Sequence, residues 1–290
     1  MTLFIFSTDG ILHARPNRFS YAGEIPPGKW LRNLKVAYSE AKDGFRNVQI
    51  FFPSGYKKGE NTRVLIALHG YGANLREWEL GSTIEKLAND LNFVIVCPDM
   101  GNTVYESKFY PETTVKWAGI PGGKFVSENL INYLNNTFAL AYEREKTGIF
   151  GLSTGGRGAM LLSALHTDIF GAAAGLSGDY DPLAMPRDRL LTAVYGDIKQ
   201  FEERWKTDDN IINLADKLIN TPVYISHGDK DSVVPKEQSW IFAIRLKQLQ
   251  KKMGGFDITY FEKKYSMHDW RYWGSMLPEV MDFFNKKLKK

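Results

Sequence analysis

The sequence predicts an α/β fold built on a central, mostly parallel β-sheet with helices on both faces. Short apolar runs recur along the 290 residues, as at 64–68 and 93–97, and such runs are typical of strands buried on both faces. Segments with helical spacing of apolar residues separate these runs. Strands that alternate with helices are joined by crossovers and pair in parallel. We therefore expect one domain over residues 1–290, with small lid segments.

The N-terminal part should add an antiparallel start to this sheet. Residues 1–33 contain three prolines and are expected to form an arm outside the regular fold. Two strand-like runs follow at 34–40 and 47–53, and the Lys-Asp-Gly sequence at 42–44 between them predicts a hairpin turn.

Helices and strands alternate through the rest of the chain. Two long stretches, 100–123 and 177–211, interrupt the alternation, and their aromatic content predicts substrate loops, the second of them a small irregular lid. The strands expected around these stretches are at 64–68, 93–97, 149–150, 170–176, 222–226 and 258–261. The expected helices are one that ends near Leu91, three over 125–140, 154–166 and 236–253, and one that begins near Trp270.

Composition narrows the class of protein. The net charge is +4, but four lysines in the last five residues supply much of the excess, and no arginine-rich stripe suggests nucleic-acid binding. No apolar run approaches the about 20 residues that span a bilayer, so we expect a soluble protein with no membrane partner. The N-terminus lacks a basic segment typical of a signal peptide, which favours a cytoplasmic location for the chain as given. Export after signal removal and homo-oligomer formation are left open.

The most informative local motif is Gly-Leu-Ser-Thr-Gly at 151–155, between a short apolar run and a helix start rich in small residues. In a strand–turn–helix setting, Gly-x-Ser-x-Gly predicts a nucleophile elbow with an exposed serine hydroxyl. The free N–H groups at the helix start would favour the negative charge that develops in acyl transfer. Ser153 is therefore the candidate nucleophile, although the motif by itself also occurs in ordinary glycine turns.

A serine nucleophile needs a base that is held in one tautomer by a carboxylate. Asp231 follows the strand at 222–226, and His268 follows the strand at 258–261. Both would lie at the carboxyl ends of parallel strands, where open α/β sheets place their sites. Asp229 is an alternative acid, and we favour Asp231.

The remaining titratable candidates are predicted to be structural. His227 should bond to backbone at a strand end, His69 should order its own loop, and His13 and His166 are expected at the surface or at helix ends. The single cysteine, Cys97, lies in an apolar run and is expected to be a buried core residue. No Cys/His cluster suggests a metal site, and no cofactor is predicted.

Acyl transfer also needs an oxyanion hole built from backbone N–H groups. The residue after the nucleophile supplies one donor, here Thr154, and a loop after an early strand supplies the other. The His-Gly-Tyr-Gly sequence at 69–72 fits that loop, with Tyr71 as the donor. By itself this sequence would be interpreted as a glycine turn. The predicted nucleophile elbow elsewhere in the chain favours a role in the oxyanion hole.

With these residues assembled, the chain resembles the α/β-hydrolase superfamily and, within it, the esterase D-like family. That family includes feruloyl and acetylxylan esterases, S-formylglutathione hydrolases and the antigen 85 mycolyltransferases. The resemblance runs from about Asn47 to the end of the chain, on LHGYG at 68–72, GLSTGGRGA at 151–159, FGAAAGLSGDYDP at 170–182, HGDKDSVVP at 227–235 and HDWRYW at 268–273.

The resemblance implies an α/β-hydrolase fold, a Ser153, Asp231, His268 triad, and Tyr71 and Thr154 as oxyanion donors. The elbow departs from the Ser-Met-Gly-Gly common in the family, since Thr154 replaces Met, but a backbone donor tolerates that change.

The substrate class rests on aromatic residues in and near the two loops. These candidates could stack on a sugar ring or a phenolic acid, or could instead pack the loops onto the sheet, and they are Tyr110, Trp117, Tyr180, Trp205 and Trp270. Neither loop has the apolar character of a lipase lid. We therefore expect a carboxylesterase for short-chain or aromatic esters, such as feruloyl or acetyl esters on carbohydrate.

Four alternatives stay open. Within the same fold, a thioesterase of the S-formylglutathione hydrolase type or an acyltransferase would use the same residues. A non-catalytic carbohydrate-binding module would have kept the fold without the reaction. A peptidase would usually carry a larger cap than this length allows.

Overall fold

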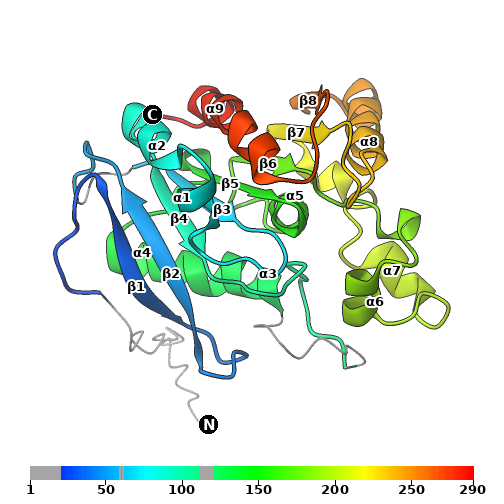
Figure 1. Cartoon of the computed structure of the whole chain (residues 1–290), viewed down its shortest axis with the longest axis horizontal. Coiled ribbons are helices and arrows are strands. Elements are labelled where there is room, and N and C mark those ends of the chain that lie inside the picture. The colour runs from blue at the N-terminus through cyan, green and yellow to red at the C-terminus, as the bar shows by residue number, and fades with distance from the viewer. Residues whose placement is uncertain (1–20, 59, 61, 112–120) are drawn as a thin grey trace, which may run out of the picture.

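Eight strands form one sheet in the described part of the chain, in the order β1-β2-β4-β3-β5-β6-β7-β8 (Figure 1). The structure is a computed structural model of the chain, and it describes residues 21–58, 60, 62–111 and 121–290. The strands are β1 Lys29–Ala37, β2 Phe45–Phe52, β3 Val64–Leu68, β4 Val94–Pro98, β5 Thr147–Leu152, β6 Ala172–Leu176, β7 Val223–Gly228 and β8 Ile258–Lys263.

Strand pairing follows the predicted pattern. Strand β2 pairs antiparallel with both β1 and β4, and all the other pairs are parallel. The expected antiparallel start and mostly parallel sheet are thus confirmed. The carboxyl ends of β5, β7 and β8 therefore point to the same edge of the sheet, which is where the candidate triad follows each strand.

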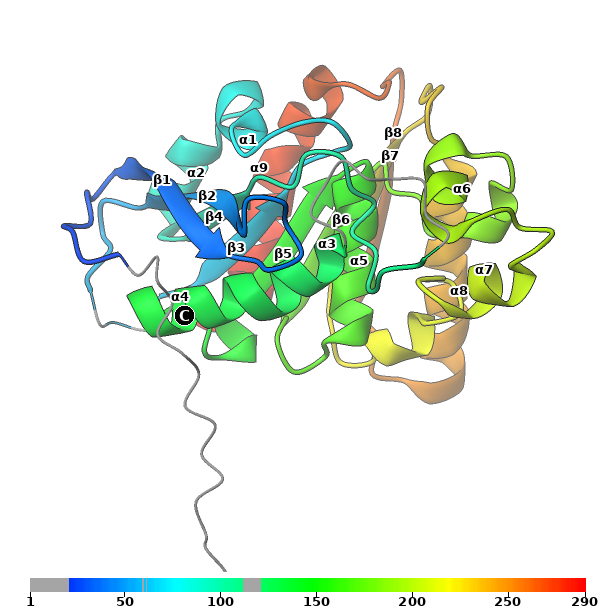
Figure 2. The same ribbon diagram turned by 90° about the horizontal axis from the view of Figure 1, so that it is seen from below.

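Helices cover both faces of the sheet, as Figures 1 and 2 show. One face carries α1, α2 and α9, and the other carries α4, α5 and α8. The α-helices are α1 Glu77–Gly81, α2 Ile84–Leu91, α3 Gly122–Lys124, α4 Ile131–Phe138, α5 Thr154–Leu165, α6 Arg189–Tyr195, α7 Glu202–Thr207, α8 Glu237–Met253 and α9 Trp270–Lys287. The other helical segments are the π-helical η1 Phe125–Leu130 and the 3₁₀ turns η2 Arg144–Lys146, η3 Pro182–Ala184 and η4 Ala215–Leu218.

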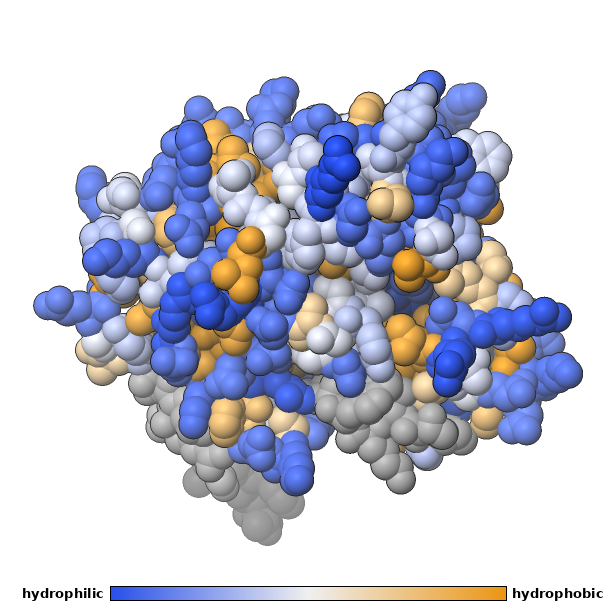
Figure 3. Space-filling model, in the orientation of Figure 1, coloured by the Kyte–Doolittle hydropathy of each residue, from blue (hydrophilic) through white to orange (hydrophobic). Residues whose placement is uncertain are grey.

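Strand β3 shows why its sequence is apolar throughout. Side chains of a strand alternate between the two faces of a sheet. Val64, Ile66 and Leu68 pack into the core beneath α4, α5 and α8, whereas Leu65 and Ala67 pack into the core beneath α1, α2 and α9. Apolar side chains of the chain are thus buried in two cores, one on each face of the sheet. The molecular surface seen in Figure 3 is mostly hydrophilic, with hydrophobic residues in small groups.

Two segments differ from the prediction. The expected arm over 1–33 is wrong at its end, because β1 begins at Lys29. The strand register shifts between Leu31 and Leu34, and Asn33 has a φ of 59°. This irregularity interrupts the alternation of apolar and polar residues by which the start of the strand would be predicted. Residues 1–20 lie outside the described residues.

The predicted irregular lid over 177–211 instead contains η3, α6 and α7. Figure 1 places α6 and α7 together at one end of the molecule, beyond β6 and β7. We call the segment from Pro182 to Thr207 the cap. Asp188 starts α6 by accepting hydrogen bonds from the N–H groups of Leu190 and Leu191.

Close packing at the elbow leads to a first prediction. A Cβ added to Gly155 would lie 2.6 Å from the backbone oxygens of both Leu68 and His69, and backbone cannot move aside cheaply. We expect Gly155→Ala to lower the free energy of unfolding by about 1–3 kcal/mol or more, measured by chemical denaturation. The control is Ser163→Ala in the same helix, α5, which should unfold near wild type. Equal stability of the two variants would contradict this account of the elbow.

Candidate active site

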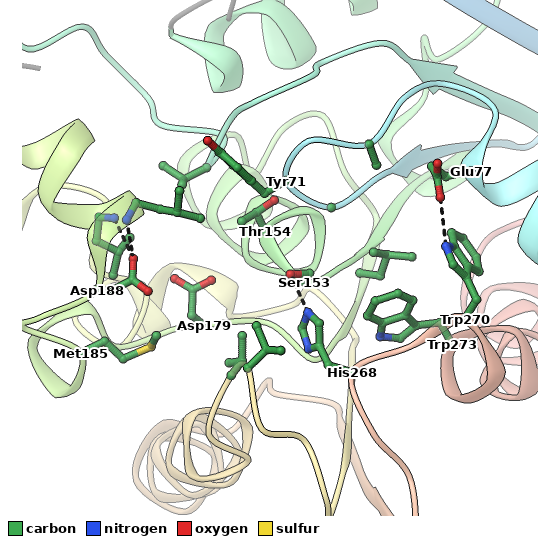
Figure 4. A pocket seen from close by; sticks show the side chains of 18 residues that line it. Tyr71, Glu77, Ser153, Thr154, Asp179, Met185, Asp188, His268, Trp270 and Trp273 are labelled. Carbon is green, nitrogen blue, oxygen red and sulfur yellow. Dashed lines mark hydrogen bonds between the residues drawn. The ribbon is translucent and has the colours of Figure 1, made fainter. Parts of the chain in front are cut away.

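Ser153 lies on the sharp turn between β5 and α5, with φ 53° and ψ −126°. A non-glycine residue at positive φ is strained and is typical of functional turns. The Ser153 Oγ lies 3.0 Å from Nε2 of His268 (Figure 4), and Nδ1 of His268 lies 2.7 Å from Oδ2 of Asp231. The structure thus brings together the three residues that the sequence selected, in one continuous hydrogen-bonded chain.

The Asp231 carboxylate is fixed from several sides. Its Oδ1 accepts hydrogen bonds from the N–H groups of Val233 and Val234, both at 2.9 Å. Burial of the carboxyl acts to raise the pKa of Asp231, but hydrogen bonds from His227, His268 and Val234 outweigh it and hold the pKa well below its usual range. Asp231 is therefore an anion that faces His268. Asp229 instead contacts the N–H of Ser266.

His227 also contacts the Asp231 carboxylate. Its Nε2 lies 3.0 Å from the carbonyl oxygen of Val234 and 3.2 Å from Oδ2 of Asp231. Both neighbours are acceptors, so Nε2 carries the proton, and Nδ1 accepts from the hydroxyl of Ser239 at 2.7 Å. The expected backbone contact of His227 is present, but sequence reasoning missed its contact with Asp231.

His69 orders the loop that follows β3. The N–H of Met100 donates to its Nε2 at 2.9 Å, so Nδ1 carries a proton and donates to the carbonyl oxygen of Gly70 at 2.6 Å. Burial lowers the pKa of His69, which favours this neutral form. Tyr71 and Thr154 both line the same cavity as Ser153, the first from this loop and the second from the start of α5 (Figure 4).

The triad opens into a cavity of about 360 Å³. Its walls come from the loop after β3, the elbow, the loops after β6 and β7, the cap and the start of α9. The lining residues are Gly70, Tyr71, Ala73, Glu77, Val104, Leu152, Ser153, Thr154, Asp179, Met185, Asp188, Leu190, Leu191, Val233, Val234, His268, Trp270 and Trp273.

One wall of the cavity is aromatic. The ring of Trp273 stands edge-on to the ring of His268, with centroids 5.0 Å apart, and Trp270 stands edge-on to Trp273 at 5.6 Å. The indole N–H of Trp270 donates to Oε2 of Glu77 at 3.0 Å. Because these contacts fix both rings, this wall offers a rigid apolar surface beside the candidate base.

Three of the aromatic substrate candidates are wrong. Tyr110, Tyr180 and Trp205 are all buried and do not line the cavity. Tyr110 and Trp205 pack on Tyr195 of the cap, and Tyr180 packs on Phe242 of α8. Tyr110 and Trp205 therefore form the small core of the cap, and Tyr180 fixes its loop to α8. Of the other two candidates, Trp270 lines the cavity, and Trp117 lies outside the described residues.

Sequence reasoning missed the acidic side of the cavity. Asp179 comes three residues after the end of β6, in the stretch Leu-Ser-Gly-Asp, and its place beyond the carboxyl end of a parallel strand was the available signal. No comparable signal marks Asp188 or Glu77. Asp188 is equally well explained as the N-cap of α6, and Glu77 as an acidic residue in the first turn of α1.

The described residues offer no other obvious chemistry. Across residues 21–58, 60, 62–111 and 121–290, no group of three or more His, Cys, Asp or Glu side chains is arranged to hold a metal ion. Within the same part of the chain, every helix is too short or too polar to span a lipid bilayer.

Comparisons with known proteins bear on the family of this chain. The family model named Esterase, described as "Putative esterase", matches residues 39–284. An acetyl esterase of Caldicellulosiruptor saccharolyticus is 27% identical over 244 residues, which cover 78% of this chain and 85% of that protein.

One further relative and one solved structure carry other names. The diacylglycerol acyltransferase/mycolyltransferase Ag85A of Mycobacterium gordonae is 24% identical over 261 residues, which cover 79% of this chain and 74% of that protein. Among solved structures, the fluorophosphonate-binding serine hydrolase F of Staphylococcus aureus has a TM-score of 0.68 at 17% identity, over 90% of this chain and 99% of that chain. That likeness concerns the fold.

Proposed function

This chain belongs to the Esterase family of α/β-hydrolases, and from that premise we propose that it is a serine carboxylesterase for short-chain or aromatic esters. The observation that carries the proposal is the hydrogen-bonded chain from Ser153 through His268 to Asp231 at the wall of a cavity large enough for a small ester. Such a chain supplies a nucleophile, a base and an orienting carboxylate within contact distance.

In the first step, Ser153 Oγ attacks the ester carbonyl carbon while Nε2 of His268 takes the hydroxyl proton. Negative charge moves to the carbonyl oxygen, and the backbone N–H groups of Tyr71 and Thr154 are the proposed donors that stabilise it. His268 then returns its proton to the leaving alcohol oxygen as the carbon–oxygen bond breaks, and an acyl-enzyme remains on Ser153.

In the second step, water replaces the alcohol. His268 takes a proton from the water, whose oxygen attacks the acyl carbon, and Ser153 leaves with that proton as the acid is released. Asp231 stays ionised throughout and stabilises the imidazolium that forms twice in the cycle, consistent with its lowered pKa.

The cavity wall favours a compact acyl group. Trp270, Trp273 and Leu152 form an apolar surface near Ser153, and Met185, Leu190 and Leu191 of the cap limit the space opposite. The acetyl esterase relative supports the short-chain end of this range. A flat aromatic acyl group could also lie against the Trp270 side.

Fluorophosphonate labelling tests the site directly. We expect the protein to form one covalent phosphonyl adduct, mapped by mass spectrometry to Ser153, and to lose activity on p-nitrophenyl acetate in proportion to labelling. Hydrolysis should fall from the acetate to the octanoate, and methyl ferulate should also be cleaved. Absence of an adduct and of hydrolysis would favour a non-catalytic binding module.

Acyl transfer is the second candidate, since a relative is named as an acyltransferase. The acyl-enzyme would then pass its acyl group to an alcohol instead of water. Adding increasing concentrations of glycerol or a sugar to the p-nitrophenyl acetate assay and measuring the acetylated product distinguishes the two. The thioesterase alternative is tested by comparing the hydrolysis of a thioester and an oxygen ester of the same acyl group, because a thioesterase would prefer the thioester.

A further inference from the structure

The cavity beside Ser153 has several carboxylates on its described walls. Glu77, Asp179 and Asp188 all line it, and no lysine or arginine is among the described lining residues. Figure 4 shows Asp179 and Asp188 on one side of Ser153, and Glu77 with Trp270 on the other. A substrate therefore meets a carboxylate on the aromatic side of Ser153 and two carboxylates on the cap side.

Asp179 is the most firmly built of these carboxylates. Its residue is 6% exposed, and its Oδ2 accepts from Nη1 of Arg157 at 3.2 Å. Arg157 is fully buried in α5, so the carboxylate is anchored to the helix that begins at the elbow. The next two backbone N–H groups, of Tyr180 and Asp181, both donate to Oε1 of Gln238, which fixes the loop.

Arg157 does not turn toward the cavity. Its Nη1 also donates to the backbone oxygen of Asp179, and its Nη2 donates to the hydroxyl of Tyr195 and to the backbone oxygen of Asp209. The guanidinium is thus held behind Asp179, where it orients the carboxylate without reaching the lining. Burial raises the pKa of Asp179 to about 6 even with Arg157 beside it. A further donor from the cavity side would compensate for that burial.

The other two carboxylates already have structural tasks. Oδ1 of Asp188 accepts from the N–H groups of Leu190 and Leu191 at the start of α6, and Oε2 of Glu77 accepts from the Trp270 indole. Both still add negative charge to the lining. A carboxylate on the substrate would be repelled there, whereas a hydroxyl or ammonium group would find an acceptor.

We infer that Asp179 is a specificity-determining residue, which selects esters that present a hydrogen-bond donor, a hydroxyl or ammonium group, on the cap side of the scissile bond and rejects esters that present a carboxylate there. This inference rests on the proposed function, since it places the substrate at Ser153. It narrows the substrate class to polyhydroxylated or amine-bearing esters.

Substituted phenylboronic acids provide a matched set of probes. Oγ of Ser153 would bond to boron and its proton would pass to His268, which gives a tetrahedral adduct whose inhibition constant can be measured. The set carries methyl, hydroxymethyl, aminomethyl or carboxyl at the 3- or 4-position, measured near pH 8. For at least one position we expect the hydroxymethyl and aminomethyl compounds to bind at least about tenfold more tightly than the carboxyl compound, with methyl between them.

Variants assign the preference to one residue. Asp179→Asn keeps an oxygen for Arg157 and should reduce the donor-over-carboxyl preference to less than about threefold, that is, well under the 1.4 kcal/mol that corresponds to tenfold. The control is Asp181→Asn, which removes a negative charge two residues away, outside the lining, and should keep the preference.

The outcomes separate the two proposals. If no boronic acid inhibits and no fluorophosphonate adduct forms, the proposed function fails. If the boronic acids inhibit but the carboxyl compound binds as tightly as the others to the wild type, the inference about Asp179 is overturned while the esterase stands. A preference that survives in Asp179→Asn also overturns it, and a wild type without the preference overturns it whether or not that variant folds.

Discussion

Replacing Ser153 with alanine is expected to lower kcat for ester hydrolysis by about 10⁶-fold, which corresponds to about 8 kcal/mol of transition-state stabilisation. The variant has no oxygen to attack the carbonyl carbon, so His268 and the proposed oxyanion donors have no covalent step to assist. Stopped or continuous assays with p-nitrophenyl acetate measure the loss, and the fluorophosphonate adduct should disappear with it.

The fold should survive this change. The Ser153 hydroxyl contacts Nε2 of His268, while the backbone of the elbow is held separately by the hydrogen bond from the Ser153 N–H to the carbonyl oxygen of Leu176. Thermal unfolding near that of the wild type is therefore expected. Ser163→Ala in α5 is the matched control and should keep its activity, because Ser163 lies outside the cavity lining. Residual hydrolysis within tenfold of the wild type would mean that another group is the nucleophile.

The residues of the triad could be found from the sequence because each follows an element that the sequence also defines. A turn after an apolar run locates Ser153, and parallel strands bring the segments after β7 and β8 to the same edge as the elbow. The local chain order and the direction of the strands are sufficient to bring these residues together. No side-chain packing has to be known.

Residues that bind substrate could not be found in the same way. Aromatic rings in a loop either face a ligand or secure the loop, and only the tertiary packing of α6, α7 and α8 decides between these uses. That packing buries Tyr110, Tyr180 and Trp205. Asp179 was missed for a related reason, since a polar residue after a strand reads as a turn until Arg157 is placed behind it.

Replacing Asp231 with asparagine is expected to lower kcat by about 10⁴-fold through the tautomer of His268. The N–H groups of Val233 and Val234 both donate to Oδ1, so the single oxygen of asparagine would stay there and its NH₂ would replace Oδ2. A donor would then face Nδ1 of His268. Nδ1 would have to accept, and the ring proton would move to Nε2, which faces Ser153. His268 could no longer take the proton of the serine hydroxyl.

The alternative acid supplies the control for this prediction. Asp229→Asn makes the same chemical change two residues away, on a carboxylate whose Oδ1 contacts the N–H of Ser266 at 3.3 Å rather than His268. Its kcat should stay within about threefold of the wild type, since it changes no hydrogen bond of the triad. If Asp229→Asn loses more activity than Asp231→Asn, the acid has been assigned to the wrong residue. If both variants keep full activity, His268 does not depend on a carboxylate. Only a large loss confined to Asp231→Asn agrees with a base held in one tautomer by the carboxylate after β7.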